Sequence, residues 1–496
     1  MIRDEVILVY PGFNRSRFLH NKPRRTEIPM GILSVGSALK EAGFKPRLVD
    51  GRYENTRKKM RGYVNEKTLF VGISSMTCNQ ITFGIDAAKA SRKINPYIPI
   101  VWGGMHPTVL PEETLKTCEY SDIVCRKEGE ASGVELAKAL QRGDSLEGIE
   151  GLSYKDKDGS IIHNPDRPFL DFDKLPIPDY GLLDKNVYDL SYLSYQGSRG
   201  CPHRCKFCEV GPIHNRRYRA RRVETILADL EDILKRYPVR DINFLDENVF
   251  VDLDNARSFA NGILERGMNF EWRAFCRADY FRKTDIGFWR LMKRAGCGIV
   301  NIGGESGSQK TLDNMRKDYK VEDIINAAAQ LEEASLDNSF SFICGLPDET
   351  LEDIDETVGL VDRLLRDFKR VNIFEILVYM PLPETPFYEE VKAKGCAFPH
   401  RLEDWGTFLW GGKSFARWHP HHEHVFRLAL ISKWTKKIPA WKIWRSLRRL
   451  NPAASLMYLC GYVSYYRWRY KFFKWPLDIY MQYWLNRFVF KSLWQR

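Results

Sequence analysis

The sequence lacks the features of several protein classes. Its longest nearly uncharged apolar run, Pro452–Tyr466, is shorter than the roughly 20 residues that cross a bilayer, so we expect no transmembrane helix. No signal-peptide pattern precedes the strand-like segment Val6–Tyr10, and the eleven cysteines show no disulfide-type spacing. We therefore expect a cytoplasmic protein in a reducing compartment. The chain also lacks a distant second C-x2-C pair, which disfavours a structural zinc site.

What the chain does contain is a compact cysteine run, in which Cys201, Cys205 and Cys208 have C-x3-C-x2-C spacing with an aromatic residue before the last cysteine. Iron–sulfur cubanes usually take four thiolates. Three thiolates on one loop would leave one iron open to a small molecule, so we predict that these cysteines are metal ligands. The alternatives are a zinc site or three unrelated buried thiols. We interpret the other eight cysteines as core or neutral thiols.

Residues 1–140 alternate strand and helix patterns. We expect strands at Val6–Tyr10, Arg47–Asp50, Leu69–Ser74, Ile98–Trp102 and Asp122–Cys125, with a helix over Gly31–Gly43. This alternation predicts a parallel, doubly wound α/β sheet with a ligand at the carboxyl ends of its strands. Small and polar residues follow several of these strands, which would let the backbone approach a bulky, flat ligand.

Residues 141–190 form a predicted connector, with a hairpin over Tyr154–Ile162 and then a proline-rich strap. Strand and helix patterns alternate again over residues 191–395, and six βα units predict an open, partial (β/α)6 barrel. The expected barrel strands are Tyr192–Gln196, Asp241–Leu245, Glu271–Cys276, Ile299–Gly303, Asn338–Ile343 and Asn372–Val378. We expect a mainly helical region over residues 396–496.

The cysteine run resembles the signature of the radical S-adenosylmethionine (SAM) superfamily, and the first 140 residues resemble the cobalamin-binding domain that precedes many radical SAM domains. The resemblance covers about residues 5–395. It implies an N-terminal Rossmann-like cobalamin-binding domain and a radical SAM barrel. The implied cofactors are a [4Fe–4S] cluster on the three cysteines, SAM chelated to the open iron, and cobalamin. An electron donor such as flavodoxin or ferredoxin is also implied.

The resemblance also implies which residues bind the cofactors. For the cobalamin domain these are the strand-end residues Tyr10, Pro11, Asp50, Ser74, Ser75, Gly103, Gly104, His106, Glu128, Gly129 and Glu130. Cobalamin-dependent mutases carry Asp-x-His-x-x-Gly, whose histidine is an axial ligand, but here Arg52 stands at the histidine position. The resemblance thus implies a cobalamin without that ligand. The alternative is a flavodoxin-like domain that has lost its ligand.

In the barrel, the candidate cofactor-binding residues are Asp246, Arg277, Gly304, Glu305 and Ser306. The glycines of Gly303-Gly304-Glu305 would allow close approach to SAM, and Glu305 is placed to accept hydrogen bonds from its ribose or ammonium group. A turn motif also resembles the family at Cys344–Thr350, where Asp348 replaces a glycine. The sequence does not identify a catalytic side chain.

The segment 414–496 is basic and aromatic. It has sixteen Lys and Arg residues against Glu423 and Asp478, so it carries +14 while the rest of the chain sums to −2. Eight of the thirteen tryptophans also lie in it. We predict an amphipathic segment that contacts a membrane. The alternatives are a packed helical cap and nucleic-acid binding, which no RNA-binding module signature supports. We interpret His419, His421, His422 and His424 as a solvated loop rather than a metal site.

Two cofactors facing one another imply radical methylation. By resemblance, a methyl group passes from methylcobalamin to an unactivated carbon after the radical made from SAM removes its hydrogen. The basic aromatic segment favours a small hydrophobic substrate, such as a lipid or tetrapyrrole. The alternative is an oxidative cyclase of the anaerobic magnesium-protoporphyrin type. An RNA methylthiotransferase lacks support because its second cysteine triad is missing, and the intact cysteine loop argues against a non-catalytic cobalamin-binding regulator.

Overall fold

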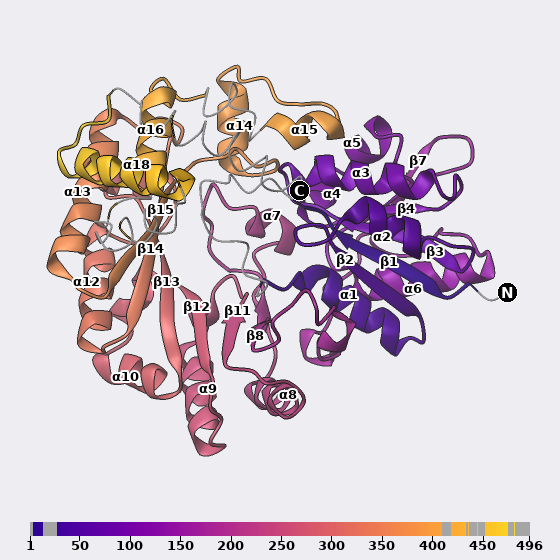
Figure 1. The fold of residues 1–496 in the computed structure, drawn as a ribbon, viewed down its shortest axis with the longest axis horizontal. Coiled ribbons are helices and arrows are strands. Elements are labelled where there is room, and N and C mark those ends of the chain that lie inside the picture. Colours follow the sequence, from indigo (N-terminus) through magenta and orange to yellow (C-terminus); the bar gives the residue numbers. More distant parts are fainter. Residues whose placement is uncertain are drawn as a thin grey trace.

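The computed structural model describes residues 3–12, 27–408, 418–432 and 452–474, together with Thr435, Trp444 and Met481. Two parallel sheets lie side by side (Figure 1), one in the N-terminal domain and one in a half-barrel. The segment 414–496 falls mostly outside the described residues. Within the described residues, no helix combines the length and the apolar character needed to span a bilayer.

The N-terminal sheet has seven strands in the order β2-β1-β3-β4-β5-β6-β7, parallel from β2 to β5. Its strands are β1 Glu5–Tyr10, β2 Lys45–Asp50, β3 Thr68–Ser74, β4 Ile100–Gly103, β5 Ile123–Cys125, β6 Leu152–Lys155 and β7 Ile161–His163. The predicted hairpin is present as β6 and β7. It pairs antiparallel with β5, so it extends the sheet instead of standing apart from it.

Helices cover both faces of this sheet, as the doubly wound pattern predicts. They are α1 Met30–Glu41, α2 Thr56–Tyr63, α3 Gln80–Arg92, α4 Met105–Val109, α5 Pro111–Thr117 and α6 Gly129–Arg142. Val6 and Leu8 of β1 face one apolar core with α1 and α6, and Ile7 and Val9 face the other core with α3. Because both faces are buried, only the ends of the strands are open to a ligand.

The half-barrel is a six-stranded parallel sheet in the order β15-β14-β13-β12-β11-β8, which confirms the predicted partial barrel. Its strands are β8 Tyr192–Tyr195, β11 Asp241–Phe244, β12 Glu271–Arg277, β13 Cys297–Glu305, β14 Asp337–Cys344 and β15 Val371–Val378. A small ribbon, β9 Ser198–Arg199 with β10 Arg219–Ala220, closes the base of the cysteine loop.

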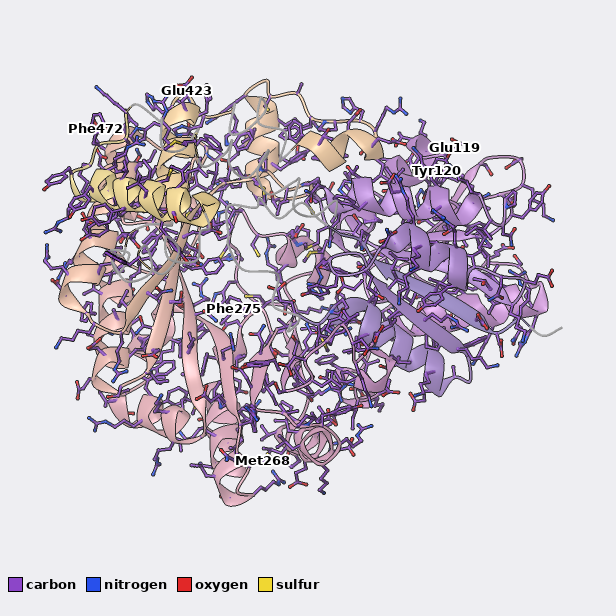
Figure 2. The ribbon with its side chains drawn as sticks, viewed as in Figure 1. Glu119, Tyr120, Met268, Phe275, Glu423 and Phe472 are labelled. Atoms are coloured by element: carbon purple, nitrogen blue, oxygen red, sulfur yellow. The ribbon has the colours of Figure 1, made fainter. Side chains whose placement is uncertain are left out.

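The barrel helices are α7 Val210–His214, α8 Val223–Arg236, α9 Leu253–Glu265, α10 Ile286–Arg294, α11 Gln309–Asn314, α12 Val321–Glu333, α13 Leu351–Asp367 and α14 Pro386–Ala393. Along β12, Trp272, Ala274 and Cys276 are buried in the apolar core, whereas Phe275 between them is 47% exposed. The opposite, inner face of the strand is therefore open. Figure 2 shows Phe275 on the side of the sheet toward the N-terminal domain.

The described C-terminal helices are α15 Leu402–Phe408, α16 His422–Ser432 and α18 Pro452–Arg469. Helix α15 crosses to the N-terminal domain and packs on α3 and α5 (Figure 1), where the Trp405 indole donates to Glu113 at 2.7 Å. Helix α16 packs on β15, and α18 packs on α16. Trp468 is buried and donates to Asp362 at 2.8 Å, so this part of the C-terminal region is a helical cap.

The prediction that the histidines form a solvated loop is wrong for His419. Its side chain is buried, its Nε2 lies 2.9 Å from the Glu349 carbonyl, and its Nδ1 accepts from the His421 backbone. His422 begins α16. The run of four histidines suggested solvent exposure because it is polar, but the contact with the loop after β14 is not visible in the local sequence. No group of three or more histidines, cysteines or acids that could bind a single metal ion is found within the described residues.

Candidate functional site

The cysteine loop leaves the ribbon strand β9 and is held by the barrel on two sides. The Lys206 backbone donates to the Met315 carbonyl at 3.0 Å and accepts from the Phe387 backbone at 3.1 Å. Cys201, Cys205 and Cys208 are half-buried free thiols on this loop. They do not converge on one point in the way that ligands of a single ion do. In a cubane each thiolate binds its own iron, so such convergence is not expected.

Burial raises the pKa of Cys201, and it raises the pKa of Cys208 to about 12. Free thiolates are therefore disfavoured there, and a metal cluster would supply the positive charge that stabilises them. Arg277, one of the predicted residues, reaches the loop: its guanidinium donates to the Cys205 Sγ at 3.5 Å. These thiols fit a cluster because they are free, clustered in sequence and faced by a cation.

The end of β13 faces the same loop. Glu305 has a left-handed backbone, φ 61°, and its carboxylate accepts from the buried Lys317 ammonium at 2.9 Å. Burial opposes the charged form of Lys317, but Glu305, Tyr319 and Cys205 together outweigh burial and raise the Lys317 pKa. The sequence analysis missed Lys317, which lies twelve residues beyond Glu305 with no motif of its own. The connection from α11 to α12 also contains Arg316, Asp318 and Lys320, so no local signal distinguishes Lys317.

Two other predicted barrel residues are engaged with the protein itself. Asp246 is buried and accepts from the Gly197 backbone at 3.0 Å and from the Ser198 hydroxyl at 2.5 Å. Burial raises the Asp246 pKa to about 7. Ser306 is also buried, with its hydroxyl 3.0 Å from that of Thr357. Their roles as cofactor contacts stay predictions, whereas their roles in shaping the β8 and β13 ends are visible in the structure.

At the carboxyl edge of the N-terminal sheet, Tyr10, Ser74, Gly103 and Gly104 lie on adjacent strand ends, as the parallel order β1-β3-β4 requires. Gly104 has φ 89°, and a Cβ added there would lie 2.7 Å from the Ser75 carbonyl oxygen. Only glycine fits this position without displacing Ser75. The Ser75 backbone N–H donates to the Gly103 carbonyl oxygen at 2.9 Å. This tight backbone cradle fits the close approach of a flat cofactor.

Arg52 is held firmly at the position where mutases have histidine. Its guanidinium forms an ion pair with the buried Asp50 at 2.6 Å and lies 4.5 Å from the centre of the Tyr10 ring. Asp50 also accepts from the Tyr188 hydroxyl of the connector. Asp50 is therefore committed to orienting Arg52, and Pro11 is buried beside it.

His106 is fully buried. Its Nδ1 lies 3.0 Å from the Thr77 hydroxyl, its ring packs edge-on against Trp405, and its Nε2 has no hydrogen-bond partner among the described residues. Burial lowers the His106 pKa to about 3, so the ring is neutral. The side chain supports the edge from behind, between α4 and the C-terminal helix α15.

Glu128 and Glu130 face arginines of the ribbon that carries the cysteine loop. Arg199 reaches Glu130 at 2.6 Å and Glu128 at 3.2 Å, and Arg219 reaches Glu128 at 2.8 Å. Burial opposes ionisation of Glu130, but Arg199 and the Ser34 hydroxyl together outweigh burial and lower the Glu130 pKa. Gly129 starts α6 between the two acids. These ion pairs join the two domains, a role that the sequence analysis did not foresee.

The two predicted sites face one another. Helix α7, which follows directly after Cys208, contacts α4, which follows Gly104 (Figure 1). Glu209 directly precedes α7, and its Oε2 is buried without a hydrogen-bond partner among the described residues. The elements that follow the cysteine loop and the glycine edge are therefore in contact across the two domains.

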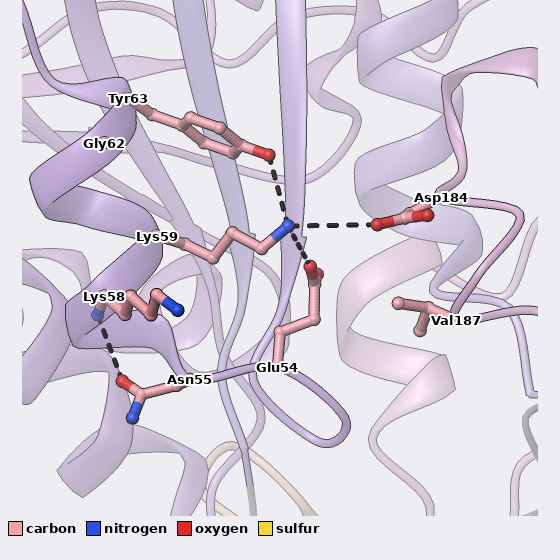
Figure 3. Close-up of a pocket in the computed structure, with 8 residues that line it drawn as sticks. All are labelled: Glu54, Asn55, Lys58, Lys59, Gly62, Tyr63, Asp184 and Val187. Carbon is pink, nitrogen blue, oxygen red and sulfur yellow. Dashed lines mark hydrogen bonds and ion pairs between the residues drawn. The ribbon is translucent and has the colours of Figure 1, made fainter.

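A different pocket, of about 410 Å³, lies between α2 and the connector (Figure 3). Lys59 reaches Glu54 at 2.7 Å, the Tyr63 hydroxyl at 3.2 Å and Asp184 at 3.9 Å. These contacts of Lys59 link α2 to the connector. Because they already pair the charged groups of Lys59, Glu54 and Asp184, we assign the pocket no ligand.

The chain matches two family models: the Radical SAM superfamily over residues 195–361 and the B12 binding domain over residues 17–137. It is also 30% identical over 367 residues, 73% of this chain and 78% of the relative, to an uncharacterized methyltransferase of Pyrococcus horikoshii. The chain belongs to the cobalamin-dependent radical SAM family. Its cofactors are a [4Fe–4S] cluster, SAM and cobalamin, and it is a radical SAM enzyme of the methyltransferase group.

Other members of this family are more distant. The anaerobic magnesium-protoporphyrin IX monomethyl ester cyclase of Rubrivivax gelatinosus is 26% identical, over 78% of this chain and 70% of the cyclase. Two solved structures share the fold of this radical SAM chain. OxsB has a TM-score of 0.69 and 20% identity, and the match covers 94% of this chain and 72% of OxsB. The methyltransferase TsrM of Kitasatospora setae has a TM-score of 0.63 and 19% identity, and the match covers 79% of this chain and 75% of TsrM.

Proposed function

We propose that this enzyme transfers a methyl group to an unactivated carbon of a hydrophobic substrate bound on the inner face of the half-barrel. The observation that supports this proposal is a set of large apolar side chains that are exposed on the barrel strands. Phe275 is 47% exposed, Phe374 is 65% exposed and Leu377 is 40% exposed. Exposed apolar surface beside a reaction centre is typical of a ligand site.

The strands β13 and β14 lie between Phe275 of β12 and the two exposed residues of β15. Phe275 of β12 is in register with Asn301 of β13, and Asn301 with Ser339 of β14. Phe374 lies at an irregularity of β15, between Ile373 and Glu375, which pair with Phe340 and Ser341. In-register residues of neighbouring strands share a face. An apolar rim with hydroxyl and amide groups between its two sides suits a largely apolar body with a few polar substituents.

When bound, the cluster and cobalamin supply the radical and methyl-transfer chemistry. In the proposal, Cys201, Cys205 and Cys208 hold the cluster, and the β13 end from Gly303 to Glu305 binds SAM. The cobalamin is held by the edge made of Tyr10, Ser74, Ser75, Gly103 and Gly104. The protein orients the reactants and excludes water, and the interdomain ion pairs of Arg199 keep the two sites in one geometry.

Arg52 defines the cobalamin side of this proposal. The ion pair with Asp50 fixes an arginine, which is not a metal ligand, where a histidine would bind cobalt. We therefore expect the electron paramagnetic resonance spectrum of the cob(II)alamin form to lack splitting from a protein nitrogen. Clear coupling to a histidine nitrogen would contradict the proposal.

Relatives differ in their named activities, which leaves a second candidate. A hopanoid C-3 methylase of Methylococcus capsulatus and a bacteriochlorophyllide d C-12(1)-methyltransferase of Chlorobaculum tepidum are among the relatives, and their names support methylation here. The cyclase of Rubrivivax gelatinosus supports a ring-forming alternative. We further propose that the enzyme takes its electron from a flavodoxin or ferredoxin and works in the cytoplasm.

The deciding experiment is anaerobic reconstitution with both cofactors, followed by mass spectrometry of hopanoid and chlorophyllide-type candidates. A gain of one methyl group supports methylation, whereas a product with an unchanged carbon count supports cyclisation. The variant Phe374→Asp should lower product formation while SAM cleavage continues. Tyr97→Asp, which changes a 90% exposed aromatic residue outside the barrel, is the matched control. Equal effects of the two variants would refute the inner-face site.

A further inference from the structure

A pocket of about 610 Å³ lies where the end of β5, the connector and the turn after α7 meet. Its lining contains four cations, Lys127, Arg167, Arg217 and Arg219, and one carboxylate, Asp166. None of the lining residues is a predicted cofactor ligand. Arg167 is paired with Glu135 on α6 and with Glu150 beyond it, so Lys127, Arg217 and Arg219 are the cations that a ligand could use, and the proposed methyl transfer does not use them.

Two of the cations are fixed around one aromatic ring. The Arg219 guanidinium lies 4.3 Å from the centre of the Phe169 ring, and the Lys127 ammonium lies 5.6 Å from it. Each cation also has an anionic anchor: Lys127 pairs with Asp166 at 2.6 Å, and Arg219 pairs with Glu128 at 2.8 Å. Held in this way, the cations lose little side-chain freedom when an anion binds.

Donors remain unused at this pocket. The Nε atom of Arg219 is buried and has no hydrogen-bond partner in the described part of the chain. Arg217 is exposed, and no partner of its guanidinium is found among the described residues. Asn215 and Tyr218 add an amide and a hydroxyl to the lining.

The turn that carries Arg217 has a defined shape. Asn215 and Arg216 both adopt left-handed backbone angles, φ 50° and 54°. The Arg216 backbone donates to Gly211 at 3.2 Å, and the Arg217 backbone donates to His214 at 2.9 Å. The Arg217 carbonyl also packs against Gly200, the residue before Cys201. The turn is thus a fixed part of the loop that holds the three cysteines.

We propose that this pocket binds the phosphate group of a small molecule. A phosphate offers several strong acceptor oxygens and a double negative charge, which matches two arginines, a lysine and neighbouring neutral donors better than a single carboxylate does. The ligand lies against the turn 215–217, so its binding should also slow hydrogen exchange over residues 210–219. The proposal stands apart from the methyl-transfer function, because no residue of the inner barrel face takes part in it.

The test uses the full chain, loaded with cluster and cobalamin, and isothermal titration with inorganic pyrophosphate. We expect one site in the wild type. Arg217→Glu should weaken binding at least about tenfold, since it replaces a charge-assisted contact with repulsion. Arg216→Glu is the matched control: it makes the same charge change at the neighbouring exposed arginine, which does not line the pocket. The control should stay within about twofold of the wild type, and Arg217→Lys, which keeps the positive charge, should weaken binding less than Arg217→Glu does.

Three results would overturn the proposal. Equal weakening by Arg216→Glu and Arg217→Glu would reduce the effect to general surface charge. Binding that is present without cobalamin and abolished by cobalamin would assign the pocket to the phosphate of the cofactor. Absence of saturable pyrophosphate binding, including the case in which only an acidic protein binds this face, would exclude a small-molecule phosphate site.

Discussion

The two parallel sheets of this protein offer ligands different kinds of surface. In the N-terminal sheet, β1 and β3 are buried along almost their whole length, so the open surface is the carboxyl edge. In the half-barrel, β12 and β15 alternate between buried and open side chains, so one face of the sheet is itself available. A sheet covered on both sides presents mainly backbone and short side chains at its edge, whereas an open face presents side chains of any size.

The difference indicates a division of labour. The edge around Gly104 has a shape that one added carbon would change, which suits a cofactor that does not vary. The inner barrel face carries Phe275 and Phe374, which can be exchanged without disturbing the core on the other side of the strands. We therefore expect substrate choice to depend on the barrel face and cofactor binding to depend on the edge and the cysteine loop.

We expect the largest effect from removing the three thiols of the half-barrel that are predicted to hold the cluster. Replacing Cys201, Cys205 and Cys208 with alanine should abolish iron binding and SAM cleavage together, because all three predicted thiolates are lost. Cobalamin binding should persist, since its edge belongs to the other sheet. Iron analysis and absorbance spectra measure both. Cys396→Ala, at a half-buried thiol elsewhere, is the control, and a triple variant with a full complement of iron would contradict the assignment.

The ion pairs of Arg199, which connect the two domains, are expected to give the next largest effect. Arg199→Ala leaves the buried Glu128 and Glu130 without their shared partner, and breaking a buried ion pair costs about 3–5 kcal/mol. Urea unfolding followed by circular dichroism should show this loss. Arg222→Ala removes an exposed ion pair with Asp173 and should cost under about 1 kcal/mol. If both variants lose the same stability, the Arg199 ion pairs do not hold the domains together.

Two glycines with the same φ angle test whether the strand edge around Gly104 binds cobalamin. Gly43 and Gly104 both have φ 89°, but an added Cβ meets nothing within 4 Å at Gly43 and lies 2.7 Å from Ser75 at Gly104. Alanine should cost each site about 1 kcal/mol of stability through backbone strain, and Gly104→Ala should cost more because its Cβ also meets the Ser75 backbone. Only Gly104→Ala should also weaken cobalamin binding, about tenfold or more, in an absorbance titration. Unchanged affinity in that variant would place the cofactor elsewhere.

The smallest expected effect concerns the C-terminal region, which packs on the barrel yet keeps an open side. Leu459 and Val463, one turn apart on α18, are 51% and 42% exposed. We propose that residues 414–496 contact anionic membrane, with each nearby Lys or Arg contributing about 1 kcal/mol. The full chain should sediment with anionic vesicles, less with neutral ones, and less at high salt. If the full chain does not sediment with anionic vesicles at low salt, the C-terminal region acts only as a helical cap.

Most strands could be predicted from the sequence to within one or two residues, because alternation of apolar runs with helical periodicity is a local property. The cysteine loop and the Gly103-Gly104 turn were also visible as spacing. Two features were not. The hairpin after residue 151 was recognised but not its pairing with β5, and His419 was placed in solvent although it is buried. Both depend on which distant segment lies alongside, and local patterns do not carry that information.

The sequence by itself determined the order of elements, the position of the thiols and the positions where the backbone must be glycine. Only the tertiary structure decided that Glu128 and Glu130 bind Arg199, some seventy residues away, that Lys317 pairs with Glu305, and that Lys127 and Arg219 meet around Phe169. The physical reason is the range of the interactions. Backbone preferences and apolar periodicity act between near neighbours, whereas a buried charge takes whichever partner the packing of separate βα units brings within reach.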